Sequence, residues 1–269
     1  MVNIKIMKIQ FLHIKLFFLA FAISYSSYGK EGNRLLKTQE IFESLIQTHS
    51  IRIEEPIVDK YKSDFLDRIN LFKQKKEKSL NDEAFLEHLF YKVHRVYLKK
   101  YKPYQSFEKL FEKGEYGCLT GTALYALILE ELGYQTEIRE TNYHIFLIVQ
   151  TENQRFLIES TDPLNGFLAS AVLISKRLKE INSNSLFSDK AERYEFKCKI
   201  NRKIRLEELI GLQYYNVATQ YYNRGYFELA IHFLHKSRQT YQSGRQKEFF
   251  ELILSQSSTV SNTFAISSK

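Results

Sequence analysis

An apolar helix followed by two apolar strands forms the centre of this sequence and restricts it to a mixed helix-and-sheet fold. The segment 118–132 carries apolar residues along one helical side and ends at Gly133, a common helix stop. The segment 144–150 is an almost continuous apolar run, and 155–159 returns after a polar turn. This pattern predicts a hairpin that is covered on both faces. The chain has only 10 glycines and 3 prolines, so long helices are expected around this centre.

Apolar residues also recur at helical spacing on both sides of this centre. Asn81 precedes one such segment and is a favourable N-cap, because its side chain can accept a hydrogen bond from the first helical turn. The remaining predicted elements are helices over 34–53, 57–76, 82–97 and 168–181, strands over 136–140 and 194–200, and a connecting segment over 104–114.

The last part of the chain is predicted to be a helical hairpin. From Leu206 one helical face of apolar residues leads to a tight turn at 223–225, and a second such face follows the turn. A third helix is predicted over 245–254. The final segment, 255–269, is rich in serine and threonine and is predicted to be disordered.

The N-terminus has the composition of an export signal. Lys5, Lys8 and Lys15 form a positive region, and an apolar core follows at 16–23. Small residues then lead to Gly29, after which cleavage is predicted. The apolar core is short for a membrane span, but the same pattern suits an uncleaved N-terminal membrane anchor, which is the alternative.

The formal net charge of +8 gives little indication of a charged partner. Lysines and arginines are spread along the predicted helices, which is typical of solvated helix faces. No basic cluster interleaved with aromatic residues fits the pattern of a known nucleic-acid-binding module. We therefore expect no nucleic-acid partner and at most a weak association with an anionic envelope surface.

Cys118 is the strongest candidate for chemistry. It follows Gly117 at a predicted helix start, where unpaired backbone N–H groups and the positive end of the helix dipole stabilise a thiolate. His144 begins the first strand of the predicted hairpin and Glu159 ends the second, so their side chains are expected near one another at its open end. A thiol beside an imidazole that a carboxylate orients is the general form of a nucleophilic triad. The N–H groups at the helix start could also serve as an oxyanion hole.

Other residues compete for roles near this cluster. Asp162 is the alternative acid, although it could instead cap a turn. Tyr116 and Asn142 are candidate oxyanion or polar helpers. Cys198 lies in an alternating, strand-like segment and is expected to pack as a small apolar residue rather than to form a disulfide with Cys118.

Metal binding is a further interpretation of the same residues. Cys118, His144 and a carboxylate could hold zinc. The closely spaced ligand pairs that are typical of zinc sites, CxxC and HExxH, are absent from the sequence. We therefore expect no metal and no cofactor at this site.

The central segments resemble the transglutaminase-like cysteine superfamily. The resemblance covers about residues 80–170 and lies in Tyr-Gly-Cys-Leu-Thr-Gly-Thr-Ala-Leu-Tyr at 116–125, His-Ile-Phe-Leu at 144–147 and Glu-Ser-Thr at 159–161, with Gly166 nearby. It implies a papain-like core with a small antiparallel sheet, and a catalytic triad of Cys118, His144 and Glu159. In the wider superfamily the acid is usually aspartate and a tryptophan often follows the histidine, whereas Glu159 and Ile145 occupy those places here.

The chain looks closer still to a bacterial branch in which a transglutaminase-like core is followed by tetratricopeptide repeats. The residues similar to one tetratricopeptide unit are Tyr215, Ala218, Tyr221, Gly225, Phe227, Ala230 and Ile231. A single unit cannot bury its own face and must pack on something else. It is expected either to dock on the core as an ordinary helical hairpin or to form a groove for a protein partner.

These observations predict an exported α+β cysteine enzyme with a helical N-terminal lobe. The expected reaction is acyl transfer on a protein or peptide: a protease, amidase or deamidase if water resolves the thioester, and a transglutaminase if an amine does. The alternative is a protein-binding scaffold with weak or no turnover that uses the C-terminal helices. The predicted boundaries are a signal peptide over 1–29, a transglutaminase-like domain over 30–205, a tetratricopeptide-like hairpin over 206–254 and a disordered tail over 255–269.

Overall fold

The computed structural model describes residues 33–48, 53–183 and 197–267. The chain divides into two compact units, 1–40 and 41–269, and the predicted central helix, hairpin and C-terminal helices all belong to the second. The predicted signal peptide over 1–29 lies outside the described residues. Residues 33–46 are helical and overlap the first part of the helix predicted over 34–53.

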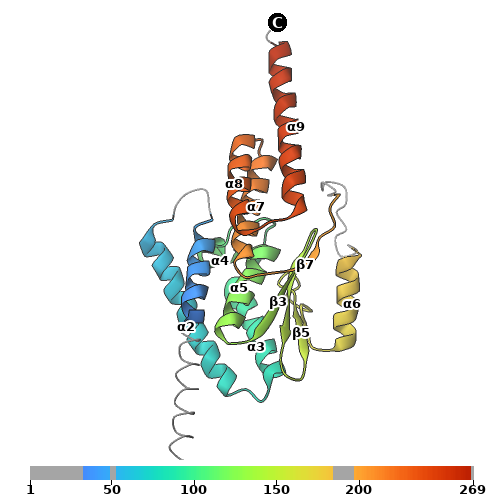
Figure 1. The fold of residues 1–269 in the computed structure, drawn as a ribbon. Coiled ribbons are helices and arrows are strands. Elements are labelled where there is room, and N and C mark those ends of the chain that lie inside the picture. The colour runs from blue at the N-terminus through green and yellow to red at the C-terminus, as the bar shows by residue number, and fades with distance from the viewer. Residues whose placement is uncertain (1–32, 49–52, 184–196, 268–269) are drawn as a thin grey trace, which may run out of the picture. The chain divides into compact units, whose positions relative to one another are not determined.

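A five-stranded antiparallel sheet forms the centre of the second unit (Figure 1). Its strands are β3 (Gln135–Thr141), β4 (Ile145–Gln150), β5 (Arg155–Ile158), β6 (Phe167–Leu168) and β7 (Asn201–Ile204). They lie in the order β6-β5-β4-β3-β7, so the predicted hairpin of β4 and β5 is central. In that hairpin Leu147 pairs with Ile158, and Gln150 pairs with Arg155.

Side chains of β4 alternate between the two faces of the sheet, and a helix covers each face. α5 (Cys118–Glu131) packs on the face that carries Leu147, and α6 (Ala171–Asn182) packs on the face that carries Phe146. Figure 1 shows the two helices on opposite sides of the sheet. This alternation follows from the two-residue period of a strand. The hairpin is therefore buried on both faces, as its apolar run predicts.

Two long helices, α2 (Glu55–Glu77) and α3 (Asp82–Tyr97), precede α5 and contribute buried residues to the same apolar core. The predicted cap of α3 is confirmed, because the Asn81 Oδ1 accepts a hydrogen bond from the Ala84 N–H at 2.9 Å. The capped helix presents an apolar stripe, whose buried members are Phe85, Leu86, Leu89, Phe90, Val93 and Tyr97.

The chain between α3 and α5 contains more regular structure than the connecting segment predicted over 104–114. β1 (Lys100–Tyr101) pairs in parallel with β2 (Glu115–Tyr116), and α4 (Lys109–Lys113) lies between them in the chain. α4 has only 5 residues, so it is too short for helical periodicity to become visible in the sequence.

The strand predicted over 194–200 lies further along the chain, where β7 begins at Asn201 and pairs with β3. Part of the predicted range is outside the described residues. The side chain of Asn142 explains the later start, because its amide donates to the Cys198 carbonyl and accepts from the Ile200 N–H, each at 2.6 Å. Those backbone groups are therefore not available to the sheet ladder.

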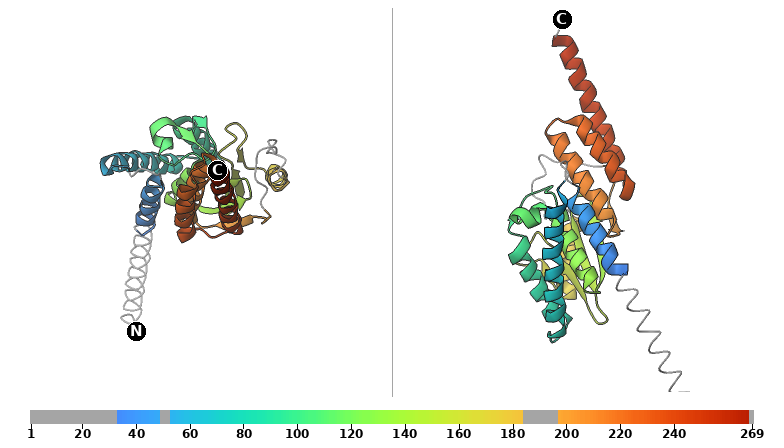
Figure 2. Two further views of the ribbon diagram at one scale, coloured as in Figure 1. Left: turned by 90° about the horizontal axis from the view of Figure 1, so that it is seen from above. Right: turned by 90° about the vertical axis from the view of Figure 1, so that its left-hand side faces the viewer.

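Three helices make up the C-terminal part, namely α7 (Glu208–Asn223), α8 (Phe227–Thr240) and α9 (Gly244–Ser267). α7 and α8 lie side by side as the predicted hairpin (Figure 2), and Gly225 forms the turn with a positive φ of 78°. Leu209 and Leu212 of α7 join the central core, while aromatic residues of all three helices form a second apolar cluster. The hairpin is therefore docked on the core.

α9 extends through most of the segment for which disorder is predicted. It is helical as far as Ser267, and the right-hand view of Figure 2 shows it running beyond the α7–α8 hairpin. Gln246, Phe249 and Ile253 are buried, so packing fixes the first turns. Because glycine and proline are absent after Gly244, helical hydrogen bonding can propagate from those turns through the serine-rich segment.

The described helices and the antiparallel sheet confirm the α+β class. Within the described ranges, no helix combines the length and the apolar character needed to cross a membrane. Cys118 and Cys198 are both free thiols, as expected.

Candidate active site

Cys118 is the first residue of α5, and the residue before it fixes its position. Gly117 is extended, and its N–H donates to the Thr120 Oγ1 at 2.9 Å. A Cβ at Gly117 would come within 3.1 Å of the Lys102 carbonyl, so the glycine allows the 102–105 segment to approach the helix start. α5 has 14 residues, which places Cys118 at the positive end of a substantial helix dipole.

Two side-chain hydrogen bonds hold the start of α5 against the central hairpin. The Thr122 hydroxyl donates to the Ile145 carbonyl at 3.1 Å, and the Ser160 hydroxyl donates to the Cys118 carbonyl at 3.3 Å. Gly121 permits this fit, because a Cβ there would lie 2.7 Å from Ser160. These contacts bring the sulfur to the ends of both hairpin strands.

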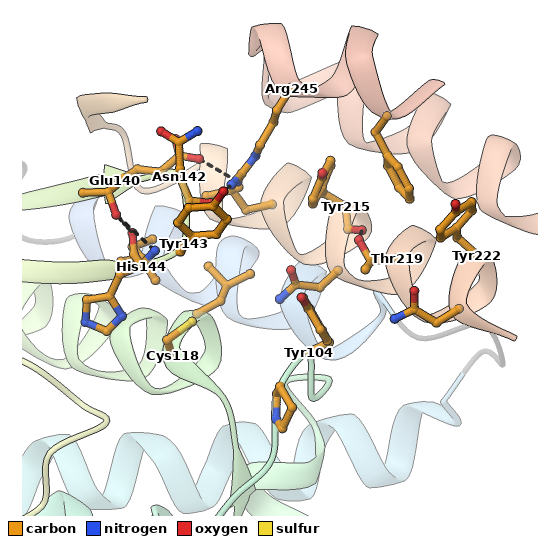
Figure 3. A pocket seen from close by; sticks show the side chains of 18 of the residues that line it. Tyr104, Cys118, Glu140, Asn142, Tyr143, His144, Tyr215, Thr219, Tyr222 and Arg245 are labelled. Atoms are coloured by element: carbon orange, nitrogen blue, oxygen red, sulfur yellow. Dashed lines mark hydrogen bonds and ion pairs between the residues drawn. The ribbon is translucent and has the colours of Figure 1, made fainter. Parts of the chain in front are cut away.

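His144 immediately precedes β4 and is held by the turn that joins β3 to β4. Its N–H donates to the Thr141 Oγ1 at 3.1 Å, and its carbonyl accepts from the Thr141 N–H at 2.8 Å. His144 is only 4% exposed, and its side chain hydrogen-bonds Cys118, beside which Figure 3 shows it. Its Nε2 lies 3.2 Å from the Glu159 Oε1, in an ion-pair contact that is less well aligned than an ideal hydrogen bond. Nδ1 is therefore the ring nitrogen left to face the sulfur.

Glu159 follows β5 and lies on the same face of the sheet as His144. Continuing the hairpin register by one residue places Glu159 opposite Phe146, and residues two apart on a strand share a face. α6 covers this face, and the Nη1 of its Arg177 binds the Glu159 Oε2 at 2.6 Å. The Nη2 of Arg177 binds Asp162 at 3.1 Å. Glu159 therefore bridges the imidazole and a guanidinium.

The ionised states of this cluster support one another. Burial acts to lower the pKa of His144, but hydrogen bonds and charges of Cys118 and Glu159 outweigh burial and raise that pKa to about 9. Burial acts to raise the pKa of Glu159, but His144 and Arg177 outweigh it and lower that pKa to about 2. At neutral pH His144 is therefore an imidazolium that faces both a carboxylate and the sulfur.

Titration of the His144 ring provides a first prediction. Since its folded pKa lies above the ordinary value of about 6.5, the charged ring stabilises the fold fully below that pH, and this stabilisation is lost as the pH rises through about 9. Cys118 is the group that raises the pKa of His144 most, so Cys118→Ala should lower the midpoint of the His144 titration by about one pH unit or more. Ring chemical shifts, assigned by the signal lost in His144→Asn, give the midpoint. A midpoint that Cys118→Ala leaves in place would mean that the sulfur does not stabilise the charged ring.

A cleft of about 420 Å³ opens at Cys118 and His144 (Figure 3). Its walls come from the 101–104 segment, the turn between β3 and β4, α7 and α9. The volume is in the range of sites that bind small molecules or short peptide segments. The C-terminal helices therefore form part of the site.

The other candidates named from the sequence lie around this cluster. Asp162 reaches it through Arg177. Tyr116 is buried and packs edge to face against Tyr101, with ring centroids 5.7 Å apart. Asn142 lines the cleft, but its amide is engaged with the backbone ahead of β7.

Cys198 occupies a different electrostatic environment from Cys118. Burial, and then the carboxylate of Glu248, raise the pKa of the Cys198 thiol to about 11. A thiol of this kind is a poor nucleophile at neutral pH and provides an internal comparison. In the part of the chain that the structure describes, no group of three His, Cys, Asp or Glu residues is arranged to hold a metal ion.

Sequence reasoning missed Arg177 and the walls of the cleft. Arg177 lies in a helix that is recognisable by its apolar spacing, but only the packing of α6 on the sheet brings it to Glu159. Tyr104, at the rim of the cleft, has a φ of 59° and is the single non-glycine residue with positive φ among those described. No local motif marks either position.

No family model matches the chain, and no curated protein matches its sequence. The geometry of the site is therefore the basis for assigning it a function.

Proposed function

We propose that this protein is a thiol-dependent acyl-transfer enzyme with Cys118 as its nucleophile. The observation that carries the proposal is the position of His144, between the sulfur and the Glu159 carboxylate at one end of the cleft. A nucleophile, a base and a group that orients the base, all in contact, meet the geometric requirement of this chemistry. The resemblance of 116–125 and 144–147 to the transglutaminase-like superfamily supports the same reaction class.

The first half of the proposed reaction forms a thioester. The Cys118 thiolate attacks the carbonyl carbon of a carboxamide or peptide, and the C–S bond forms as the carbonyl π electrons move to oxygen. N–H groups at the start of α5 stabilise this oxyanion. His144 donates its proton to the leaving nitrogen as the carbonyl reforms and the C–N bond breaks, so that an amine departs.

The second half resolves the thioester. Water or an amine attacks its carbonyl carbon, and His144, now neutral, takes the proton from the attacking atom. The C–S bond then breaks and restores the thiolate beside an imidazolium. Glu159 keeps the ring oriented and stabilises its charged form in both halves. Water as the acceptor gives hydrolysis, and an amine gives a new amide bond.

Acetylation by p-nitrophenyl acetate tests the proposal without knowledge of the natural substrate. We expect a burst of p-nitrophenolate equal to the amount of protein, and a peptide of added acetyl mass that contains Cys118. Cys118→Ser should abolish the burst, whereas Cys198→Ala should keep it, because the pKa of Cys198 is raised. A wild-type protein without a burst, or one acetylated at Cys198 instead, would contradict the proposal.

A further inference from the structure

α7 forms a long wall of the cleft, well beyond the residues assigned to the chemistry. Leu212, Asn216, Thr219 and Asn223 line the cleft at spacings of three and four, so they share one face of the helix. At 1.5 Å per residue the face from Leu212 to Asn223 is about 16 Å long. An extended peptide advances about 3.3 Å per residue, so this face matches about four or five residues of a bound chain.

Aromatic rings line the part of the cleft farther from Cys118. The Phe249 ring of α9 contacts both Tyr215 and Tyr222 of α7, with centroids 5.3 Å apart in each pair. Figure 3 shows Tyr215, Thr219 and Tyr222 following one another along α7, away from Cys118. Rings held against one another in this way are a pre-formed surface for an aromatic or apolar side chain.

The charges in the cleft are already matched within the protein. Arg245 and Glu140 both line it and bind each other at 2.6 Å. Glu140 also pairs with Arg202 at 3.1 Å, so Glu140 and Arg245 each already have a partner of opposite charge within the protein. A charged substrate side chain would lose its hydration in this cleft and would find no unpaired opposite charge among the described residues that line it. A neutral side chain does not carry this desolvation cost.

α7 also hydrogen-bonds the opposite wall of the cleft, the segment around Tyr104. The side chain of Gln220 donates to the carbonyl of Tyr104, whose backbone is left-handed, and the side chain of Gln213 donates to the Gln105 carbonyl at 3.1 Å. A left-handed tyrosine persists only where its surroundings impose it, and such conformations concentrate at binding and catalytic sites. These two glutamines therefore fix the separation of the walls before anything binds.

We propose that the acyl donor is an extended, uncharged polypeptide segment that lies along α7 with an aromatic or apolar side chain against Tyr222 and Phe249. The inference rests on the proposed function, because it places the reacting carbonyl at Cys118. The rise along α7 from Tyr215 to Tyr222 is about 10 Å, and Tyr215 is itself displaced from Cys118 along the cleft, which puts that side chain at least about three residues from the reacting carbonyl. The matched charges select against acidic and basic residues at the same position.

Peptidyl vinyl sulfones that share one reactive group test this substrate class. Three peptides are compared, which differ only at the third residue from the reactive group. That residue is tyrosine, glutamate or lysine, and every other residue is alanine. We expect the tyrosine peptide to inactivate the full chain about tenfold faster than either charged peptide. Iodoacetamide, which requires only the thiolate, is measured in parallel. Rapid alkylation by iodoacetamide with equal rates for the three peptides overturns the inference and leaves the proposed function standing, whereas slow alkylation of Cys118 contradicts the function itself.

Variants of α7 locate the preference, with each peptide rate divided by the iodoacetamide rate of the same variant. Tyr222→Ala should lower the ratio for the tyrosine peptide by about tenfold. Tyr226→Ala is the matched control, because Tyr226 is 58% exposed at the start of α8 and lies outside the cleft lining. Thr219→Lys places a cation in the middle of the wall and should reverse the preference towards the glutamate peptide. Unchanged ratios in both Tyr222→Ala and Thr219→Lys would show that α7 is not the binding wall.

Discussion

Replacing His144 by asparagine is expected to slow the alkylation of Cys118 by iodoacetamide about 100-fold at about pH 6. At that pH an ordinary thiol, with a pKa of about 8.5, is only about 0.3% ionised. The imidazolium of His144, whose pKa is raised to about 9, keeps the sulfur of the native protein in contact with a positive charge. A thiolate paired with an imidazolium is intrinsically less nucleophilic than an unpaired one, which offsets part of the expected gain.

The measurement is made in a Cys198→Ala background, so that the label reports on Cys118 alone. Asparagine keeps a polar side chain but cannot carry the charge. Arg177 binds Glu159 at 2.6 Å and is unchanged by the substitution, so the carboxylate keeps a positive charge beside it. In concentrated urea the two proteins should react at the same rate, because the pair depends on the fold. Native rates that agree within about threefold would mean that His144 does not activate the sulfur.

The main elements of the fold could be predicted because local rules determine them. α5 begins where Gly117 allows a close approach and ends before Gly133, which has a φ of 75°. The apolar run of β4 indicates a strand buried on both faces. α4 could not be predicted, because a helix of 5 residues is too short to show a repeating apolar pattern. The start of β7 was predicted too early, because the Asn142 side chain hydrogen-bonds the backbone groups of Cys198 and Ile200 just before the strand.

The site could be predicted only in part, for a related reason. The predicted hairpin was enough to expect His144 and Glu159 together at its open end, and Cys118 was joined to them by the order of the three residues and the resemblance to a known triad. Arg177 and the cleft walls depend on how α6, α7 and α9 pack on that hairpin. Such long-range packing is set by the whole core and leaves no local motif in the sequence.

Replacing Glu159, the carboxylate that contacts His144, is the second substitution for which we expect a large loss of activity. Glu159→Gln is expected to lower steady-state turnover of p-nitrophenyl acetate by about 10³ to 10⁴-fold, comparable to the loss of the orienting acid in other triads. The amide has nearly the same size but no charge, so His144 loses a counter-ion in the half-reaction in which it must accept a proton. The pKa of His144 should fall as well, because Glu159 is one of the groups that raise it.

Asp162→Asn is the matched control, because it also exchanges a carboxylate for an amide beside Arg177. Asp162 contacts this cluster through Arg177 at 3.1 Å, and an asparagine keeps an oxygen to accept the hydrogen bond from the Asn165 N–H. Turnover should therefore fall by less than about tenfold. A large loss in Asp162→Asn with a small one in Glu159→Gln would transfer the orienting role to Asp162. Small losses in both would mean that neither carboxylate holds the ring, and that His144 is positioned by the Thr141 turn alone.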